Sequence, residues 1–148
     1  MFRLYSKGCE YAIRALASVA SGNGKKRFNA EAICRKAGIP ESSTRKVLQA
    51  LVAGEFLEAT PGPGGGYKLK DAPDRITLLS IIEAVDGKEA FAGCVLGFPE
   101  CKASMPCPLH KVWMMAKDDL LEQLDSATLE ELIVVRGRRA RKRSRGKS

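Results

Sequence analysis

Three cysteines and the single histidine of this 148-residue chain fall within one short segment. They are Cys94, Cys101, Cys107 and His110. Three thiolates and one imidazole are a sufficient ligand set for an iron–sulfur cluster or another soft metal centre. Cys107 and His110 also flank the predicted start of a helix, and a helix N-terminus lowers the pKa of a nearby thiol and favours the thiolate. The segment is therefore the first candidate for chemistry in the chain.

Several interpretations of this segment remain open. The wide ligand spacing favours an iron–sulfur cluster, because structural zinc sites usually contain closer pairs such as C-x2-C. A zinc site and a thiol redox switch, in which two cysteines form a transient disulfide, are the alternatives. Catalysis by Cys107 with His110 as its base lacks a third orienting group, so we expect that the chain is not an enzyme. For His110 alone, the alternative is an ordinary helix residue.

The positive charge of the chain is concentrated in its last residues. Lys and Arg total 25 against 17 Asp and Glu, which gives a net charge of +8. Residues 136–148, RGRRARKRSRGKS, contain eight Lys or Arg and no acid, so the rest of the chain is balanced. A like-charge block of this kind predicts a disordered tail that contacts nucleic acid without sequence preference. A solubilising tail and a membrane-surface patch are the alternatives.

Composition excludes several protein classes. Hydrophobic residues make up 45% and charged residues 28%, which is typical of a globular domain. No apolar run is long enough to span a membrane, and the N-terminus lacks the apolar region of a signal peptide. Five cysteines, an odd number, argue against a disulfide framework. These observations predict a cytoplasmic protein.

The first half of the chain predicts a winged helix-turn-helix. Apolar spacing and capping residues indicate three helices, a tight Gly-Ile-Pro turn between the last two, and then two short strands around a Gly/Pro loop. The expected helices cover 7–22, 30–38 and 41–54, and the expected strands 56–60 and 67–70. Three helices followed by such a hairpin are the pattern of this DNA-binding fold.

The second half predicts helices on either side of the cysteine segment. A helix over 77–86, a loop over 88–107, a long helix over 108–124 and a capping box at Thr128 follow one another. The apolar stripe of the long helix is too extended for one small domain to cover, which predicts a homodimer. The expected fold is mainly α with a small β-hairpin wing and a long C-terminal dimerisation helix. Its predicted units are a DNA-binding domain (1–75), cluster-binding loop and dimerisation helices (76–135) and a basic tail (136–148).

Candidate DNA contacts follow from the predicted recognition helix and wing. Arg45 has the forked guanidinium that suits guanine, and Lys46 is expected at a phosphate. Wing glycines let backbone N–H groups approach the DNA backbone. The full candidate set is Arg3, Lys7, Ser42, Ser43, Arg45, Lys46, Gly64, Gly65 and Lys68. For each basic residue, the alternative is a solvated surface charge.

Taken in order, the motifs resemble a known family. An SKGxxYAIRAL helix, GPGGGYKL in the wing and TLLSIIEAVDG precede the three-cysteine loop, and CPLHKVW and LDSATLEEL follow it. This pattern, over about residues 2–135, resembles the bacterial Rrf-type winged-helix transcription regulators, which include iron–sulfur cluster regulators and nitric-oxide sensors.

The resemblance implies a homodimeric transcription repressor or activator that binds a palindromic DNA operator. It implies an iron–sulfur cluster, [2Fe-2S] in preference to [4Fe-4S], held by Cys94, Cys101 and Cys107 and sensing iron–sulfur status, oxygen or nitric oxide. His110 matches the histidine ligand of the iron–sulfur branch. Glu10 lies where the nitric-oxide-sensing branch uses a carboxylate of the partner chain. We rank His110 first as fourth ligand, Glu10 second and Cys9 third.

Overall fold

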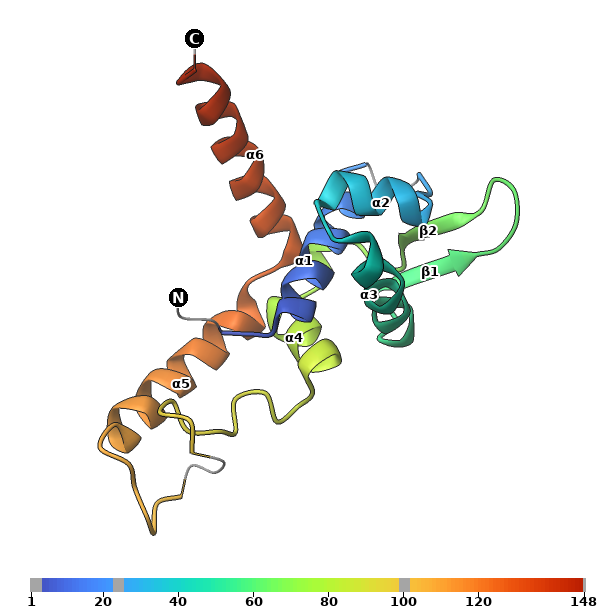
Figure 1. Cartoon of the computed structure of the whole chain (residues 1–148). Helices are drawn as coiled ribbons and strands as arrows, with labels where there is room; N and C mark the ends of the chain where they lie inside the picture. Colours follow the sequence, from blue (N-terminus) through green and yellow to red (C-terminus); the bar gives the residue numbers. More distant parts are fainter. Residues whose placement is uncertain (1–3, 23–25, 99–101, 148) are drawn as a thin grey trace.

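The computed structural model describes residues 4–22, 26–98 and 102–147. Helices form most of it, and one antiparallel hairpin extends to one side (Figure 1). In chain order the elements are α1 (Lys7–Ala20), α2 (Ala30–Ala37), α3 (Glu41–Ala53), β1 (Leu57–Thr60), β2 (Gly66–Leu69), a 3-10 turn η1 (Pro73–Arg75), α4 (Leu78–Asp86), α5 (His110–Ser126) and α6 (Leu129–Arg145). The mainly α fold with a hairpin wing is therefore confirmed.

Side-chain caps start the helices where the sequence predicts them. The Asn29 side chain accepts a hydrogen bond from the Ala32 N–H, and the Thr77 hydroxyl accepts one from the Ser80 N–H. Each cap satisfies a backbone donor that has no partner inside its helix. Gly38 then ends α2 in the left-handed conformation with φ +66°, which glycine adopts without a steric penalty.

The core lies between α1 and the helix-turn-helix. Leu16 and Val19 of α1 are fully buried, and Ile33, Leu48 and Leu51 pack in the same cluster. Burial of each such side chain contributes about 1.5–3 kcal/mol. The hairpin closes one edge of this core, because Leu57 of β1 pairs with Leu69 of β2 and both are buried.

The second half of the chain is connected to the same core. α4 packs against α1 and α5, and its Ile81 and Ile82 are fully buried. Leu129 at the start of α6 is also fully buried. Leu124 near the end of α5 joins this cluster, whereas the N-terminal part of α5 extends away from the body (Figure 1). α5 begins at His110 rather than at residue 108.

The composition of residues 136–148 predicts a disordered tail, whereas in the structure α6 continues through Arg145. Arg, Lys and Ala are good helix formers, and their propensity applies even where charges of one sign repel. The last turn also contains Lys142, Arg143 and Arg145, and cations there interact favourably with the negative end of the helix.

Among the helices of the described segments, none is long and apolar enough to cross a membrane.

Candidate nucleic-acid interface and cysteine pair

α3 contains four of the nine predicted contact residues, and three of them are exposed. Ser42, Arg45 and Lys46 are exposed and Ser43 is half-buried, whereas Val47 is buried in the core. This arrangement follows from the helical period, since the apolar positions of α3 face α1. The first turn is held by the Thr44 hydroxyl, which donates to the Pro40 carbonyl at 3.1 Å.

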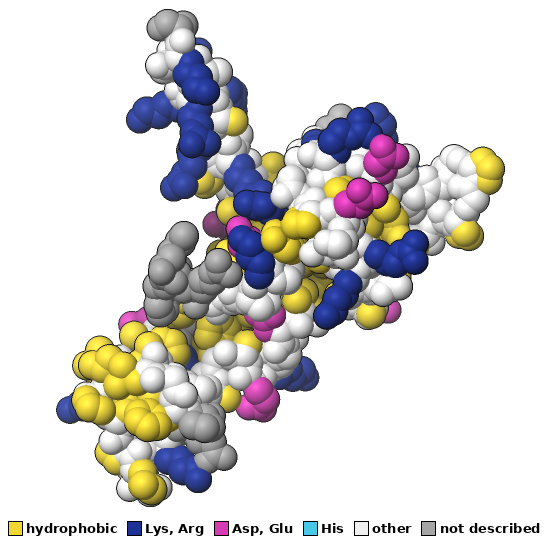
Figure 2. All heavy atoms as spheres, in the orientation of Figure 1, with side chains coloured by type: hydrophobic (Ala, Val, Ile, Leu, Met, Phe, Trp, Pro, Cys, Tyr) yellow, Lys and Arg dark blue, Asp and Glu magenta, His cyan; other side chains and the backbone are white. Residues whose placement is uncertain are grey.

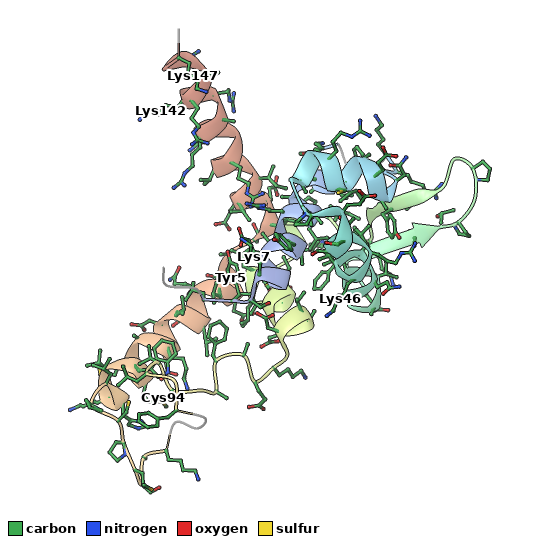
Figure 3. All side chains as sticks on the ribbon, viewed as in Figure 1. Tyr5, Lys7, Lys46, Cys94, Lys142 and Lys147 are labelled. Carbon is green, nitrogen blue, oxygen red and sulfur yellow. The ribbon has the colours of Figure 1, made fainter. Side chains whose placement is uncertain are left out.

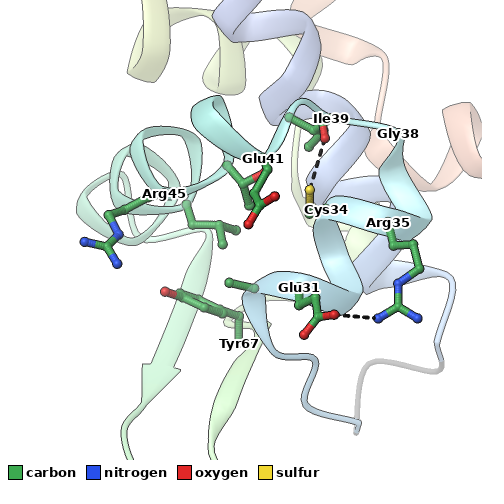
Figure 4. A pocket seen from close by; sticks show the side chains of 11 residues that line it. Glu31, Cys34, Arg35, Gly38, Ile39, Glu41, Arg45 and Tyr67 are labelled. Atoms are coloured by element: carbon green, nitrogen blue, oxygen red, sulfur yellow. Dashed lines mark hydrogen bonds and ion pairs between the residues drawn. The ribbon is translucent and has the colours of Figure 1, made fainter.

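A cavity of about 770 Å³ opens between α2, α3 and β2 (Figure 4). Arg45 lines it from the recognition helix and Tyr67 from the wing strand. Glu31 and Arg35 of α2 form an ion pair at 3.2 Å along its rim. The cavity is thus a concave surface next to the residue expected to read a base. Sequence reasoning missed Tyr67, because a tyrosine in a short amphipathic strand is equally typical of core packing.

The wing requires its glycines for backbone geometry. A Cβ atom on Gly65 would lie 2.1 Å from the Thr60 carbonyl oxygen, so no side chain fits there. Gly64 has φ +76°, in the region that favours glycine. Lys68, predicted to contact DNA, pairs with Glu58 across the hairpin at 3.6 Å. The tip is therefore a tight turn with little side-chain cover.

The start of α1 contains a charge cluster around Glu10. Its carboxylate pairs with Lys7 at 2.9 Å and with Arg14 at 3.4 Å. Lys7 remains half-exposed, which leaves its ammonium accessible to a phosphate. The structure therefore places Glu10, a candidate fourth ligand, in ion pairs of its own chain. Arg3 lies outside the described residues.

Two of the candidate ligands are in contact. The Sγ atoms of Cys94 and Cys107 lie 3.3 Å apart, although the residues are separated by 13 positions (Figure 3 labels Cys94). His110 begins α5 one turn beyond Cys107, and its N–H donates to the Cys107 carbonyl at 3.0 Å. Cys101 lies outside the described residues. The structure thus brings together the first and third of the three cysteines that are predicted to be ligands.

The indole of Trp113 fixes the loop that contains Cys94. Its N–H donates to the Gly93 carbonyl at 3.3 Å, directly before the cysteine. A cavity of about 220 Å³ next to this contact is lined by the apolar side chains of Leu4, Phe91 and Val95 together with Trp113. The loop, which has little secondary structure of its own, is therefore held against α5.

The thiols of Cys94 and Cys9 have opposite electrostatic environments. A hydrogen bond from the Leu96 N–H, together with the contact to Cys107, lowers the pKa of Cys94 and favours its thiolate. Burial and the carboxylate of Asp86 raise the pKa of Cys9 to about 12. Cys9 is fully buried in the core face of α1 and stays a neutral thiol. This environment disfavours its use as the third-ranked ligand.

The donor set fits part of a thiolate site. The thiols of Cys94 and Cys107 are in contact and partly exposed. The lowered pKa of Cys94 favours its thiolate, which is the form that binds a metal or cluster. Within the described segments no three His, Cys, Asp or Glu side chains converge closely enough to hold a metal ion. A complete site therefore needs Cys101, a partner chain, or both.

An apolar surface extends over α5 and the cysteine loop (Figure 2). Val112 and Met115 of α5 are 66% and 65% exposed, and Phe98 of the loop is 58% exposed. The apolar stripe predicted for the long helix contains Val112, Leu120 and Leu124, and the last two pack against the chain's own core. The N-terminal half of the stripe is thus the part that this chain leaves uncovered.

Solved structures share this fold. CymR, the global cysteine regulator of B. subtilis, matches with a TM-score of 0.75 at 23% identity over 91% of this chain and 98% of that chain. The structure of T. potens IscR matches with a TM-score of 0.65 at 21% identity, over 86% of this chain and 84% of that chain. These likenesses establish the winged-helix architecture.

Curated relatives and a family model place the sequence more closely. The transcriptional regulator IscR of Sodalis glossinidius is 33% identical over 88% of this chain and 78% of its own length. IscR of Pectobacterium carotovorum is 30% identical over 88% and 79%. These relatives are named as regulators, in agreement with the prediction that the chain is not an enzyme. The model of the Rrf2 family, described as iron-dependent transcriptional regulators, matches residues 5–134. The chain belongs to the Rrf2 family of transcriptional regulators.

Proposed function

We propose that this chain is a homodimeric, sequence-specific DNA-binding regulator whose affinity for a palindromic operator depends on an iron–sulfur cluster. Residues 1–75 would bind DNA in the cytoplasm, and residues 76–135 would hold the cluster and form the dimer. The observation that carries the proposal is the 3.3 Å contact between the Cys94 and Cys107 thiols, in a chain of this family. The relatives that are named IscR support it.

Cys94, Cys101 and Cys107 would hold the cluster, with His110 as fourth ligand and Glu10 of a partner subunit as the alternative. The cluster, when bound, supplies redox and gas reactivity. The residues of this chain prepare the site. Trp113 fixes the backbone before Cys94, and the Leu96 N–H stabilises the Cys94 thiolate. A nitrogen or carboxylate ligand binds iron more weakly than a thiolate, which makes that position the most labile.

Dimerisation is supported by the uncovered face of α5. Val112 and Met115 are exposed apolar residues on the helix that follows the cysteines, and the exposed Leu109 lies directly before this helix. Covering this face with the same helix of a second copy would remove it from water and bring each cysteine loop near the partner chain. The dimer and the proposed cluster would then depend on one another.

Anaerobic reconstitution with iron and sulfide tests the cluster. Wild-type protein should absorb broadly at about 400 nm, and alanine at Cys94, Cys101 or Cys107 should abolish this band and the bound iron. Cys34→Ala is the matched control, because the Cys34 thiol donates to the Ile39 carbonyl at 3.1 Å in the helix-turn-helix. Equal iron content in all four variants would contradict the proposal.

The fourth ligand is tested in the same assay. His110→Ala should keep a cluster with a shifted spectrum and lower stability to oxygen, because water would replace the imidazole. If His110→Ala leaves the cluster spectrum unchanged and Glu10→Ala shifts it, the fourth ligand is the Glu10 carboxylate.

A thiol switch is a second candidate function, favoured by the same sulfur contact. Disulfide formation needs the two Sγ atoms to approach by about 1.3 Å, to a bond of about 2.05 Å. Cys94 and Cys107 would lose two protons and two electrons, and one hydrogen peroxide molecule would become two water molecules. The oxidized form of Staphylococcus aureus CymR shares the fold at TM-score 0.68. A colourless, iron-free protein that binds DNA only when reduced, with a Cys94–Cys107 peptide cross-link by mass spectrometry, would support this function.

A further inference from the structure

The exposed half of α6 is the most strongly charged surface of the chain. Residues 136–148 contain eight Lys or Arg and no acid, whereas residues 1–135 contain 17 basic and 17 acidic residues. Figure 2 shows these cations along a helix that projects from the body, and Figure 3 labels Lys142 and Lys147 near its end. We use the name basic arm for residues 137–147.

The basic arm continues α6 (Leu129–Arg145), and the first turns of this helix pack firmly on the winged-helix domain. Leu129 is fully buried, Leu132 and Ile133 pack against the core, and α6 contacts both α1 and η1. Arg136 lies close enough to α1 to interact with its charged residues. Burial and the positive charge of Arg14 lower the pKa of Arg136, and the carboxylate of Glu10 raises it. The arm therefore leaves the domain in a fixed direction.

Beyond this root, the side chains of the described part of the helix face solvent. All residues from Arg138 to Lys147 are exposed. At 1.5 Å per residue, the helical part of the arm reaches about 13 Å past Arg136. A rigid helix of this length can reach phosphate groups that the recognition helix and the wing do not contact.

The charges of the arm repel one another along the helix. Arg138 and Lys142, and likewise Arg139 and Arg143, are spaced four residues apart, so each pair destabilises an isolated helix by about 0.2–0.5 kcal/mol. The sequence of the arm offers no carboxylate to offset this. A polyanion would neutralise these side chains and further stabilise the helix that the arm already forms.

The chemistry of the arm favours duplex DNA over a lipid surface. A membrane-surface helix needs an apolar face to insert, and from Gly137 to Lys147 the only apolar side chain is Ala140. Arginines outnumber lysines in the arm, and the guanidinium binds phosphate oxygens in a bidentate manner. Cations on all sides of the helix also match a groove that has phosphates on both edges.

We propose that the basic arm is a second DNA-binding element, a rigid helix that contacts phosphates of the duplex at a fixed distance from the recognition helix. It would add affinity for any duplex sequence, because phosphates carry no sequence information. The inference rests on the proposed DNA-binding function, and it predicts that full-length protein protects DNA beyond the base pairs that α3 and the wing can reach.

The first test compares two variants with equal charge loss. One carries Arg138→Gln, Arg139→Gln and Lys142→Gln in the arm, and the control carries Arg75→Gln, Lys88→Gln and Lys117→Gln elsewhere. Binding of a random-sequence duplex of about 30 base pairs is measured against salt concentration. The arm variant should bind about 10-fold more weakly, and its log–log salt slope should fall by about 2.7, or 0.9 per lost phosphate contact. The control should change much less.

A second variant tests rigidity while keeping every charge. Inserting Gly-Ser-Gly-Ser after Gly137 detaches the arm from its root. A rigid arm predicts weaker duplex binding and a shorter footprint, and unchanged binding would overturn the rigid-helix part of the proposal.

The remaining outcomes are also decisive. Equal losses in the arm and control triple variants would show that general charge, not the arm, governs binding, and would overturn the proposal. The proposal would also be overturned if the arm variant lost binding to vesicles that contain phosphatidylserine but bound DNA as well as the wild type. The arm would then bind a membrane surface. If the wild type binds no duplex at all, the DNA-binding function itself fails, whereas intact binding by the arm variant refutes only the arm.

Discussion

The backbone N–H of Ser6 donates to the Asp86 carboxylate at 2.9 Å, and the Ser6 hydroxyl also contacts that carboxylate. Ser6 is the N-cap of α1, and its side chain also accepts a hydrogen bond from the Cys9 N–H. Asp86 is the last residue of α4, directly before the segment that contains the cysteines. One serine therefore joins the first helix of the DNA-binding domain to the element that leads into the cysteine loop.

Replacing Asp86 with alanine should weaken this junction. The variant loses an acceptor for two donors at the start of α1, so its free energy of unfolding should fall by about 1–2 kcal/mol in urea denaturation. Asp71→Ala is the control, because Asp71 is an exposed carboxylate at the end of the hairpin. Equal stability of the two variants would show that the junction contributes nothing.

The stability of the fold should decrease at alkaline pH through Cys9. Its pKa is raised from 9.0 to about 12 in the folded chain, so above pH 9 the unfolded thiol loses its proton while the folded thiol keeps it. The unfolded state then binds fewer protons, and the free energy of unfolding falls by up to about 1.4 kcal/mol per pH unit. Denaturation between about pH 8 and pH 10 should show a steeper decline in wild type than in Cys9→Ala. Parallel declines would remove Cys9 as the cause.

Arg45→Ala should reduce sequence-specific binding. If the guanidinium reads a base edge, the loss should be about 1–3 kcal/mol and confined to one operator position. Gel-shift measurements on a set of operator variants would locate that position. Arg35→Ala, which removes an ion-paired arginine from the other side of the same cavity, should leave base preference unchanged.

Val112→Glu or Met115→Glu should dissociate the dimer. Both side chains are exposed in the single chain, so the charge is tolerated in a monomer and becomes costly only in a buried interface. Sedimentation velocity should show a dimer for wild type and a folded monomer for each variant. A wild-type monomer would remove the argument for a dimer. Leu120→Glu is a weaker test, because Leu120 packs against the chain's own core.

Local sequence rules predicted the secondary structure well. Asn29, Thr77 and Thr128 act as the caps that their residue types indicate, because a cap depends only on positions three residues away. The hairpin follows for the same reason, since glycines and apolar alternation specify it locally. The tail shows the limit of such rules: composition indicated disorder, while helix propensity and a buried root at Leu129 produce a helix.

The candidate site could be predicted in residue type but not in arrangement. Clustered cysteines indicated a thiolate site, yet the contact between Cys94 and Cys107 depends on a loop that Trp113 holds through the Gly93 carbonyl. No periodicity encodes such a contact. The ion pairs of Glu10 were visible in principle, because Lys7 and Arg14 lie three and four residues away on the same helix. The junction between Ser6 and Asp86 joins residues 80 positions apart and has no local signal.

The hydrogen bond from Trp113 to Gly93 has a practical consequence, because Trp113 is the single tryptophan of the chain. The tryptophan fluorescence of the chain therefore originates from one indole next to Cys94. Any event that rearranges the cysteine loop, whether ligand loading, oxidation or dimerisation, changes the polarity and quenching around that one fluorophore. The chain therefore contains a built-in optical reporter, with which the state of the loop can be followed in real time without an added label.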